Sequence, residues 1–424
     1  MAYLHVMARI DFVEVQFPVG QGGFHAGWLI EHGLPLDINP FVGEPAFAWA
    51  YDCGSNQQDI LNEQIRTIAG ARLDMLFLSH LDSDHVVGVD KLLLAADSVD
   101  EVILPYLCDV EWALHLAAAA GQGSLSGTFI DLVSSPSDWF GARGVQRITY
   151  IDGHSEDDEG PDSPDPIDPI GGGGIVRDGE RSRLKSSWTR SSPLVAPAGS
   201  SGSVEIIRVP KGGVAPISGS RGQLNWVLSP FAFKPSAAKL ASFEAALISE
   251  FGSGLTAKSY ADAARTKAGR GKLRKCYDAV WVSHNLHSMA LYAGPGVAPG
   301  HKLRCTARQG NLLRRVVQPG WLSTGDFDLS GTKRRKKFLQ FYSRYAPMIG
   351  QFMLPHHGSD LSFDSSVLTA FPDLTFAIAA VGTNGHGHPG RGVQKAVHAA
   401  PRLSFLRVDE SESSLLCVLG MVQQ

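Results

Sequence analysis

The segment SHLDSDHVVG, residues 79–88, places four side chains that can bind a metal ion within six consecutive positions: His80, Asp82, Asp84 and His85. It follows the short apolar run LDMLFL and precedes VDKLLLAA, whose apolar spacing predicts a helix. Alternate residues of a locally extended loop point to one side, so His80, Asp82 and Asp84 are expected to converge. Since buried carboxylates are costly unless paired, the segment predicts a metal site. The alternative is a solvated loop in which Asp82 or Asp84 caps the following helix.

Further acidic, amide and imidazole side chains follow later apolar runs, at positions predicted to be strand ends. They are Asp52 in AYDCGS, His284, Asn285 and His287 in SHNLHS, Asp326 in STGD, His356 and His357 in LPHHGS, and His386 and His388 in NGHGHPG. Loops at strand ends are where layered α/β scaffolds hold ligands. One loop seldom completes two metal sites, so we expect these segments to supply the remaining ligands.

Strand and helix patterns alternate along the whole chain. Short alternating or apolar runs predict strands, for example at residues 9–17, 73–79, 351–358 and 404–410, whereas helical spacing recurs at 59–70, 235–254 and 332–347. Such alternation favours a layered α/β fold over an all-α or all-β fold. The 424 residues, of which 44% are hydrophobic, are interpreted as a single domain spanning 1–424 with insertions.

Two segments interrupt this pattern. Residues 153–203 are rich in Asp, Glu, Pro, Gly and Ser and are predicted to be an inserted, largely irregular or flexible segment. Residues 255–276 carry a basic run that is interpreted as a loop, a frayed helix or a second insertion. The acidic insertion would repel a polyanion, so it is expected to shield a basic surface or to bind a protein partner.

Composition and termini narrow the protein class. The net charge of −4 does not indicate a uniformly basic nucleic-acid binder, although a local basic groove is compatible with it. No signal-peptide pattern opens the chain, and no apolar run approaches the roughly 18 residues of a membrane span. The five scattered cysteines show no CxxC spacing. These features predict a reduced, cytoplasmic protein without a membrane partner, and they leave the oligomeric state open.

Taken in order, the motifs resemble the metallo-β-lactamase superfamily, and within it the hydrolase domain of ComEC-type competence DNA-uptake proteins. The superfamily motif is usually His-x-His-x-Asp-His, whereas the ComEC-type branch has His-x-Asp-x-Asp-His, as residues 80–85 do. VGQG at 19–22, YDCG at 51–54, NLHSMALY at 285–292, STGD at 323–326, PHHGS at 355–359 and GHP at 387–389 follow the order of that branch. The chain departs from it at Val87, where the family has glycine, and at His386, where it has tyrosine.

The resemblance implies a metallo-β-lactamase αβ/βα four-layer sandwich that holds two divalent metal ions, zinc or manganese. One ion would take His80, Asp82 and a group from residues 284–287, where Asn285 matches the family and His284 or His287 is an alternative. The second ion would take Asp84, His85 and either His356 or His357. Asp326 would bridge the two ions, and Asp52 would orient a ligand without binding metal itself.

The resemblance also implies residues on the substrate side. Asp84 and His388 would be catalytic, with His388 stabilising developing charge or protonating a leaving oxygen. Ser359 and His386 would contact the substrate. Two basic runs would line a phosphate-binding rim: Lys333, Arg334, Arg335 to Lys337, and Arg265–Lys275. A solvated helix face is the alternative for each run.

Two divalent ions roughly 3.5–4 Å apart lower the pKa of a bridging water and bind an oxyanion, which suits ester hydrolysis. Asp82 in place of histidine makes the ligand set harder, so manganese competes better with zinc. We therefore expect a metal-dependent phosphodiesterase or nuclease acting on DNA. The alternatives are a hydrolase of a small phosphoester, a lactone or an acyl bond, and a non-catalytic binding or regulatory module.

Overall fold

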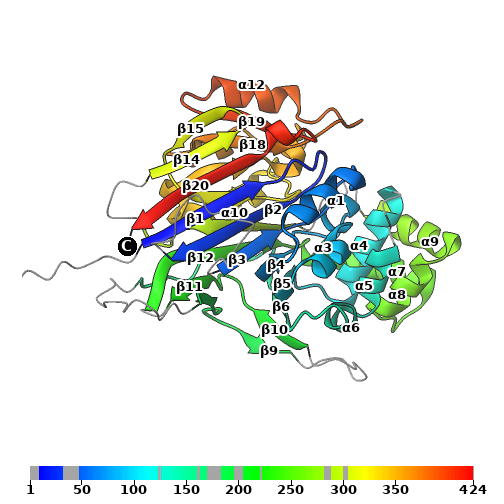
Figure 1. Ribbon diagram of the computed structural model, residues 1–424. Coiled ribbons are helices and arrows are strands. Elements are labelled where there is room, and N and C mark those ends of the chain that lie inside the picture. Colours follow the sequence, from blue (N-terminus) through cyan, green and yellow to red (C-terminus); the bar gives the residue numbers. More distant parts are fainter. Residues whose placement is uncertain are drawn as a thin grey trace, which may run out of the picture.

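The computed structural model describes residues 9–31, 47–122, 125, 127–159, 163–169, 183–194, 204–219, 222–280, 288–298 and 304–423. These residues form a mixed α/β structure built on two large sheets (Figure 1). The predicted α/β class is therefore confirmed.

The first sheet has eleven strands. In spatial order they are β15 (Leu312–Val316), β14 (Arg304–Gln309), β20 (Leu416–Gln423), β1 (Arg9–Gln16), β2 (His25–Glu31), β3 (Phe47–Tyr51), β4 (Arg72–Phe77), β5 (Ser98–Pro105), β6 (Arg147–Ile151), β10 (Glu205–Val209) and β9 (Ser192–Pro193). Strands β3, β4, β5, β6 and β10 are parallel, and the other pairings are antiparallel.

The second sheet has nine strands. In order they are β19 (Ser404–Val408), β18 (Phe376–Ala380), β17 (Ile349–Met353), β16 (Gly320–Ser323), β13 (Met289–Gly294), β12 (Gly222–Phe233), β11 (Ala215–Gly219) and β8 (Lys185–Ser186), with β7 (Gly153–His154) paired to β12. Strands β16 to β19 are parallel, so their carboxyl ends meet at one edge of the sheet.

Helices cover the outer faces of both sheets. Those near the first sheet are α1 (Gln58–Thr67), α2 (Ser83–Val86), α3 (Val89–Ala95), α4 (Asp109–Gln122), α5 (Gly127–Ser134), α6 (Pro136–Gly141), α7 (Ala237–Phe251), α8 (Ala257–Ala264) and α9 (Lys267–Asp278). Those near the second sheet are α10 (Thr332–Phe341), α11 (Ser366–Thr369) and α12 (Arg391–Ala399). Short 3-10 turns lie at Tyr342–Arg344, Ala346–Met348, Pro355–Gly358 and Glu412–Ser414.

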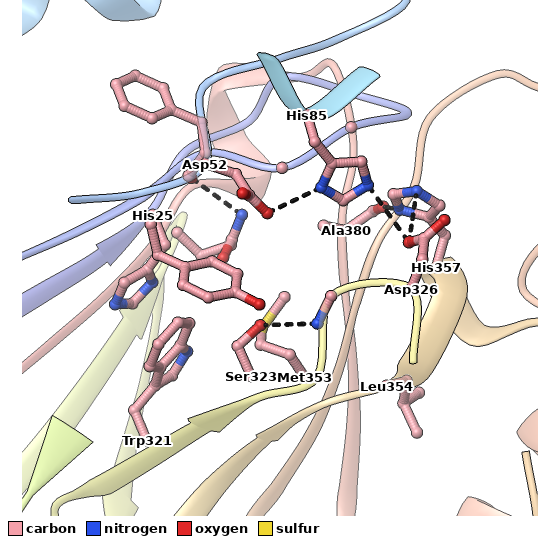
Figure 2. A pocket seen from close by; sticks show the side chains of 16 residues that line it. His25, Asp52, His85, Trp321, Ser323, Asp326, Met353, Leu354, His357 and Ala380 are labelled. Carbon is pink, nitrogen blue, oxygen red and sulfur yellow. Dashed lines mark hydrogen bonds and ion pairs between the residues drawn. The ribbon is translucent and has the colours of Figure 1, made fainter. Parts of the chain in front are cut away.

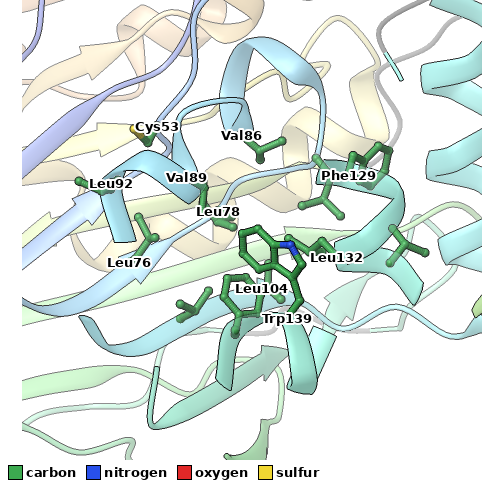
Figure 3. Close-up of a cluster of buried hydrophobic side chains, with 14 of the residues drawn as sticks. Cys53, Leu76, Leu78, Val86, Val89, Leu92, Leu104, Phe129, Leu132 and Trp139 are labelled. Carbon is green, nitrogen blue, oxygen red and sulfur yellow. The ribbon is translucent and has the colours of Figure 1, made fainter. Parts of the chain in front are cut away.

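Three clusters of buried side chains hold these layers together. One lies between the sheets and includes Phe12, Trp226 and Trp321. A second packs helices against the first sheet, with Leu78 and Leu104 of the sheet side beside Val89, Phe129 and Trp139 of the helices (Figure 3). A third packs α10 and its neighbours against the second sheet. The central strands are therefore buried on two faces, as in the fully buried β3, β17 and β18. At the edge of the first sheet, β15 is largely exposed.

The two atypical segments contribute regular structure. Described parts of residues 153–203 add β7 and β8 to the second sheet and β9 to the first, so the predicted irregular segment contains edge strands. Residues 255–276 form α8 and most of α9, which agrees with the helix alternative and not with the loop. Thr256 and Thr266 cap these helices, and Leu273, Cys276 and Tyr277 bury one face. Among the described helices, none combines the length and apolarity needed to cross a bilayer.

Candidate metal centre

Side chains from both sheets converge at one edge of the molecule. Asp52 follows β3, and the segment 79–85 follows β4 in the first sheet. In the second sheet Asp326 follows β16, and His356 and His357 follow β17. All of these strand ends point the same way, as expected for parallel neighbours, and the side chains meet where the two sheets meet (Figure 2).

Backbone hydrogen bonds fix the loop that carries the first ligands. The amide of Cys53 donates to the carbonyl of His85 over 2.8 Å, and the amide of Gly23 donates to the carbonyl of Asp84 over 3.1 Å. A Cβ on Gly54 would approach the backbone of His85 to 2.4 Å, so only glycine allows this contact. Gly23, directly after VGQG, and the YDCG motif therefore support the backbone of the SHLDSDH segment.

Asp326 lies at the centre of the cluster, with one carboxylate oxygen directed to each half. Its Oδ1 is 3.3 Å from His85 Nε2 and 3.6 Å from His357 Nε2. Its Oδ2 is 3.8 Å from His80 Nε2 and 3.6 Å from His356 Nε2. Both members of the His356–His357 pair thus face the cluster, on opposite sides of the same carboxylate.

The two other aspartates complete the two halves. Asp82 Oδ2 lies 3.7 Å from His80 Nε2, and Asp84 Oδ2 lies 3.4 Å from His357 Nε2. Potential ligand atoms of His80, His85 and Asp326, and of Asp84, His85 and His357, lie within 4.8 Å of one another in each set. The described residues can therefore hold a metal ion.

Every imidazole of the cluster is held through Nδ1, which leaves Nε2 directed inward. His85 Nδ1 is 2.8 Å from Asp52 Oδ2, and His357 Nδ1 is 2.8 Å from the carbonyl oxygen of Ala380. His80 and His356 use the hydroxyls of Ser79 and Ser362, at 2.8 and 3.2 Å. Because Nδ1 of His357 must donate to a carbonyl, its neutral tautomer presents a lone pair at Nε2, as metal binding requires.

The inward Nε2 atoms test whether metal ions fit. Nε2 of His80, His85 and His357 is buried and makes no hydrogen bond within the described part of the chain. Their 3.3–3.8 Å separations from Asp326 oxygens exceed a normal hydrogen bond. Two ligands about 2.1 Å from one tetrahedral ion would lie about 3.4 Å apart. The spacing and donor types therefore fit divalent ions.

Electrostatics at the cluster also favours cations. Burial, together with the carboxylates of Asp84 and Asp326, raises the pKa of Asp82 to about 7. Burial opposes ionisation of Asp326 as well, yet the imidazoles of His356, His357 and His85 hold its pKa well below the usual range. Three carboxylates in one half-buried site repel one another, and a divalent cation would relieve that repulsion.

The backbone is strained at the same positions. Asp52, His356 and His357 have φ values of 57°, 48° and 55°, in the left-handed region that side chains other than glycine seldom adopt. Such conformations cost about 1–3 kcal/mol each and persist only where the surroundings enforce them. Three of them among residues of this cluster are what a functional site would show.

Asp52 occupies the orienting position that the sequence predicted. Its Oδ1 accepts from the amide of Ser79 over 2.7 Å, and its Oδ2 accepts from the Ser79 hydroxyl over 2.7 Å and faces His85. Ser79 and Ser362, which contact the rings of His80 and His356, were missed. A hydroxyl directly before the first histidine of SHLDSDH was the available signal for Ser79.

His388 lies beside the cluster, on the His356 side, with ring centroids 5.2 Å apart. Burial and the neighbouring imidazoles, His356 first, lower its pKa to about 4. The exposed His386 ring stacks on that of His388 at 5.8 Å. Asn384 holds this loop by accepting from both histidine amides. The two histidines therefore extend the cluster outward to solvent.

Other predicted substrate residues lie elsewhere. Ser359 is buried, and its hydroxyl accepts from the amide of Leu361, so it belongs to the turn. Arg334 is buried over Phe233 and is paired with Glu156 and Asp328, and Arg335 is paired with Asp364. In the structure other groups of the chain engage these three residues, and their substrate contacts stay a prediction.

Within the basic run of α10, only part of the charge is available to a ligand. Lys333 is exposed, whereas Lys337 donates to the carbonyl of Asp158 over 2.5 Å. Asp158 belongs to the acidic segment 153–203, so this segment contacts one end of the basic run 333–337. Such a contact is compatible with the expectation that the segment shields a basic surface. His284, Asn285 and His287 lie outside the described residues.

A comparison of the chain with protein-family models found no match, and neither did a search of curated proteins.

Proposed function

We propose that this protein is a metal-dependent hydrolase with two divalent ions, and that its substrate is a phosphodiester, with DNA as the first candidate. The observation that carries the proposal is Asp326, whose two oxygens face separate His/Asp groups at 3.3–3.8 Å. One ion would be held by His80, Asp82, His356 and Asp326. The other would be held by Asp84, His85, His357 and Asp326.

The layer order supports a place in the metallo-β-lactamase superfamily. Two stacked sheets with helices on their outer faces are what an αβ/βα sandwich requires, and the candidate ligands lie at one edge of both sheets. Val87, the departure from the family glycine, has φ −61° and packs on the core, so a side chain is tolerated there.

Bound divalent ions supply Lewis acidity and acidify water, which is the chemistry that phosphodiester cleavage needs. The residues of the chain position these groups: Asp52 and the Ala380 carbonyl orient two imidazoles, and Asp326 joins the two halves. His388, neutral at pH 7 because its pKa is about 4, would donate an N–H hydrogen bond to a substrate oxygen. A donor set rich in aspartate favours manganese more than a set made only of histidines would.

The test is cleavage by purified protein loaded with Mn²⁺ or Zn²⁺. Single- and double-stranded DNA and bis-p-nitrophenyl phosphate would be compared with a lactone and a thioester. We expect DNA cleavage that Asp84→Asn lowers at least about 100-fold, because Asp84 faces the cluster. The control is Asp90→Asn: Asp90 lies on α3, and its carboxylate pairs with Arg143. This variant should cleave DNA as the wild type does.

Cleavage of only the lactone or thioester would replace DNA by a small acyl substrate and keep the metal centre. Full activity of Asp84→Asn would reject the proposed catalytic centre. A wild-type protein that retains no metal and shows no metal-dependent melting shift would instead favour a binding module.

A further inference from the structure

A small cavity lies behind the candidate metal centre, between the two sheets. Its volume is about 30 Å³, and its lining includes His25, Asp52, Trp321, Ser323, Asp326 and Ala380. Asp52 and Ala380 are the groups that hold Nδ1 of His85 and His357. The cavity therefore borders the groups that hold these two imidazoles, and it also borders Asp326 (Figure 2).

His25 is the unexplained polar residue of this cavity. It is 3% exposed, and neither ring nitrogen has a hydrogen-bond partner among the residues that the structure describes. Burial lowers the pKa of His25 to about 3, so the ring is neutral and offers one N–H donor and one lone pair. Leaving such groups unsatisfied costs about 1–3 kcal/mol each.

The indole of Trp321 adds a second unsatisfied donor. Its ring stacks on His25 with centroids 3.9 Å apart and planes 12° apart, and its buried Nε1 has no partner in the described residues. A cavity lined with unsatisfied polar atoms holds water, whereas dry cavities are lined by apolar groups. About 10–15 Å³ suffices for one water molecule, so 30 Å³ is enough.

The stacked pair also joins the two sheets just below the ligand-bearing strand ends. His25 begins β2 and is the register partner of Tyr51, which immediately precedes Asp52. Trp321 lies in β16, two residues before Ser323 and five before Asp326. The separation of these strands sets the distance from Asp326 to the ligands that follow β4.

We propose that His25 is a positioning residue of the metal centre, which acts through ordered water in this cavity. The water hydrogen-bonds the His25 imidazole and polar atoms around Ser323, and thereby fixes the gap between β2 and β16. This inference rests on the proposed metal binding, but it does not depend on the substrate.

The test is Mn²⁺ affinity, measured by calorimetry on the full chain. His25→Phe keeps a flat ring on Trp321 but removes both nitrogens, so we expect the Kd for Mn²⁺ to rise about tenfold or more. His25→Gln retains a donor and an acceptor and should recover part of the affinity. The metal-free melting temperature of His25→Phe should stay near the wild-type value, because the ring stack on Trp321 is kept and the hydrogen bonds that are lost are made to water.

Tyr292→Phe is the matched control. Tyr292 also stacks on a ring, that of Tyr345, and donates a buried hydrogen bond to the carbonyl of Pro295 over 2.9 Å. It lies in the third core cluster, outside the cavity lining. Loss of the Tyr292 hydroxyl should lower the free energy of unfolding without changing the Kd for Mn²⁺.

A high-resolution crystal structure of the wild type would show directly whether ordered water occupies the cavity beside His25. Density for water within hydrogen-bond distance of His25 is expected, and a dry cavity would overturn the inference even if no His25 variant folds. A folded His25→Phe protein with wild-type affinity would also overturn it. Failure of the wild type to bind Mn²⁺ would refute the metal centre itself, and the positioning role with it.

Discussion

Each imidazole of the candidate metal centre divides its two nitrogens between two tasks. Nδ1 contacts Asp52, Ser79, Ser362 or the Ala380 carbonyl, and Nε2 faces a carboxylate. The acceptors Asp52 and the Ala380 carbonyl therefore require an N–H at Nδ1 of His85 and His357, which leaves the lone pair of the neutral ring at Nε2. The shared carboxylate of Asp326 is the residue on which the two halves depend.

Asp326→Asn should remove the metal while leaving the fold intact. The change keeps the shape of the side chain but removes the charge that both halves share. We expect bound Mn²⁺ or Zn²⁺, measured by elemental analysis, to fall below a tenth of the wild-type content, while the far-ultraviolet circular dichroism spectrum stays that of the folded wild type.

The matched control is Asp328→Asn, two residues along the chain, where the carboxylate faces Arg334 at 3.8 Å. It should keep the wild-type metal content. Equal metal content in Asp326→Asn would contradict the assignment of Asp326 as a shared ligand.

Ionisation of Glu14 should make the free energy of unfolding depend on pH, independently of the candidate metal centre. Burial between the sheets raises its pKa well above the ordinary value, although Gln351 donates a hydrogen bond of 2.8 Å to it. The protonated form thus stabilises the fold below about pH 4, and this contribution is lost as the pH rises through the folded pKa.

Glu14→Gln should therefore be more stable than the wild type at pH 7, by about 1–3 kcal/mol, and the difference should vanish near pH 4. Unfolding free energies of both proteins in urea, from pH 4 to pH 8, give the comparison. A constant difference across this range would show that the carboxyl does not change its ionisation on folding.

At the scale of elements, the sequence predicted long segments with a strong apolar periodicity well. Helices at 58–67 and 237–251 agree closely with the predicted ranges. The helix predicted at 332–347 ends at 341, and the strand predicted at 351–358 lies at 349–353. Residues 257–278 were less readable because α9 contains two glycines and many cations, and its burial depends on packing against α4. Strands β8 and β9, of two residues each, are edge strands without any periodic pattern.

Helix α10 shows why a basic run does not by itself indicate a binding surface. Arg334→Ala should lower the unfolding free energy by about 2 kcal/mol, because the buried guanidinium packs 4.5 Å from the Phe233 ring centroid and pairs with Glu156. Lys333→Ala, an exposed neighbour, should change it by less than about 0.5 kcal/mol. Chemical denaturation of both variants measures the difference, and equal losses would contradict the structural role of Arg334.

At the scale of the whole molecule, the candidate metal centre joins the two sheets. The sequence indicated the loops at 52, 79–85, 326 and 356–357, which carry the candidate ligands and their supports, because each follows an apolar run. It could not predict that His356 and His357 face opposite oxygens of Asp326, since this depends on two consecutive left-handed residues. Nor could it predict the fit between the sheets that encloses His25, because packing across the interface has no local signal.

Metal removal should therefore loosen the junction between the sheets. With free Mn²⁺ at about 100 times its Kd, binding adds about 2.7 kcal/mol to the unfolding free energy. Dialysis against a chelator should lower the melting temperature, and added Mn²⁺ should restore it. Asp326→Asn should show neither change, and an identical melting temperature with and without chelator in the wild type would argue against bound metal.

The pairing of β1 with β20 has a consequence for how the chain is connected. Arg9 is the register partner of Gln423, whereas Gln16 pairs with Leu416 at the end of the ladder nearer the metal centre. The first and last of the described strands are thus neighbours, and a short peptide between Arg9 and Gln423 would close this part of the backbone into a ring. A circular permutant, reopened at the turn of Gly310 and the exposed Asn311 between β14 and β15, should retain every strand pairing of both sheets.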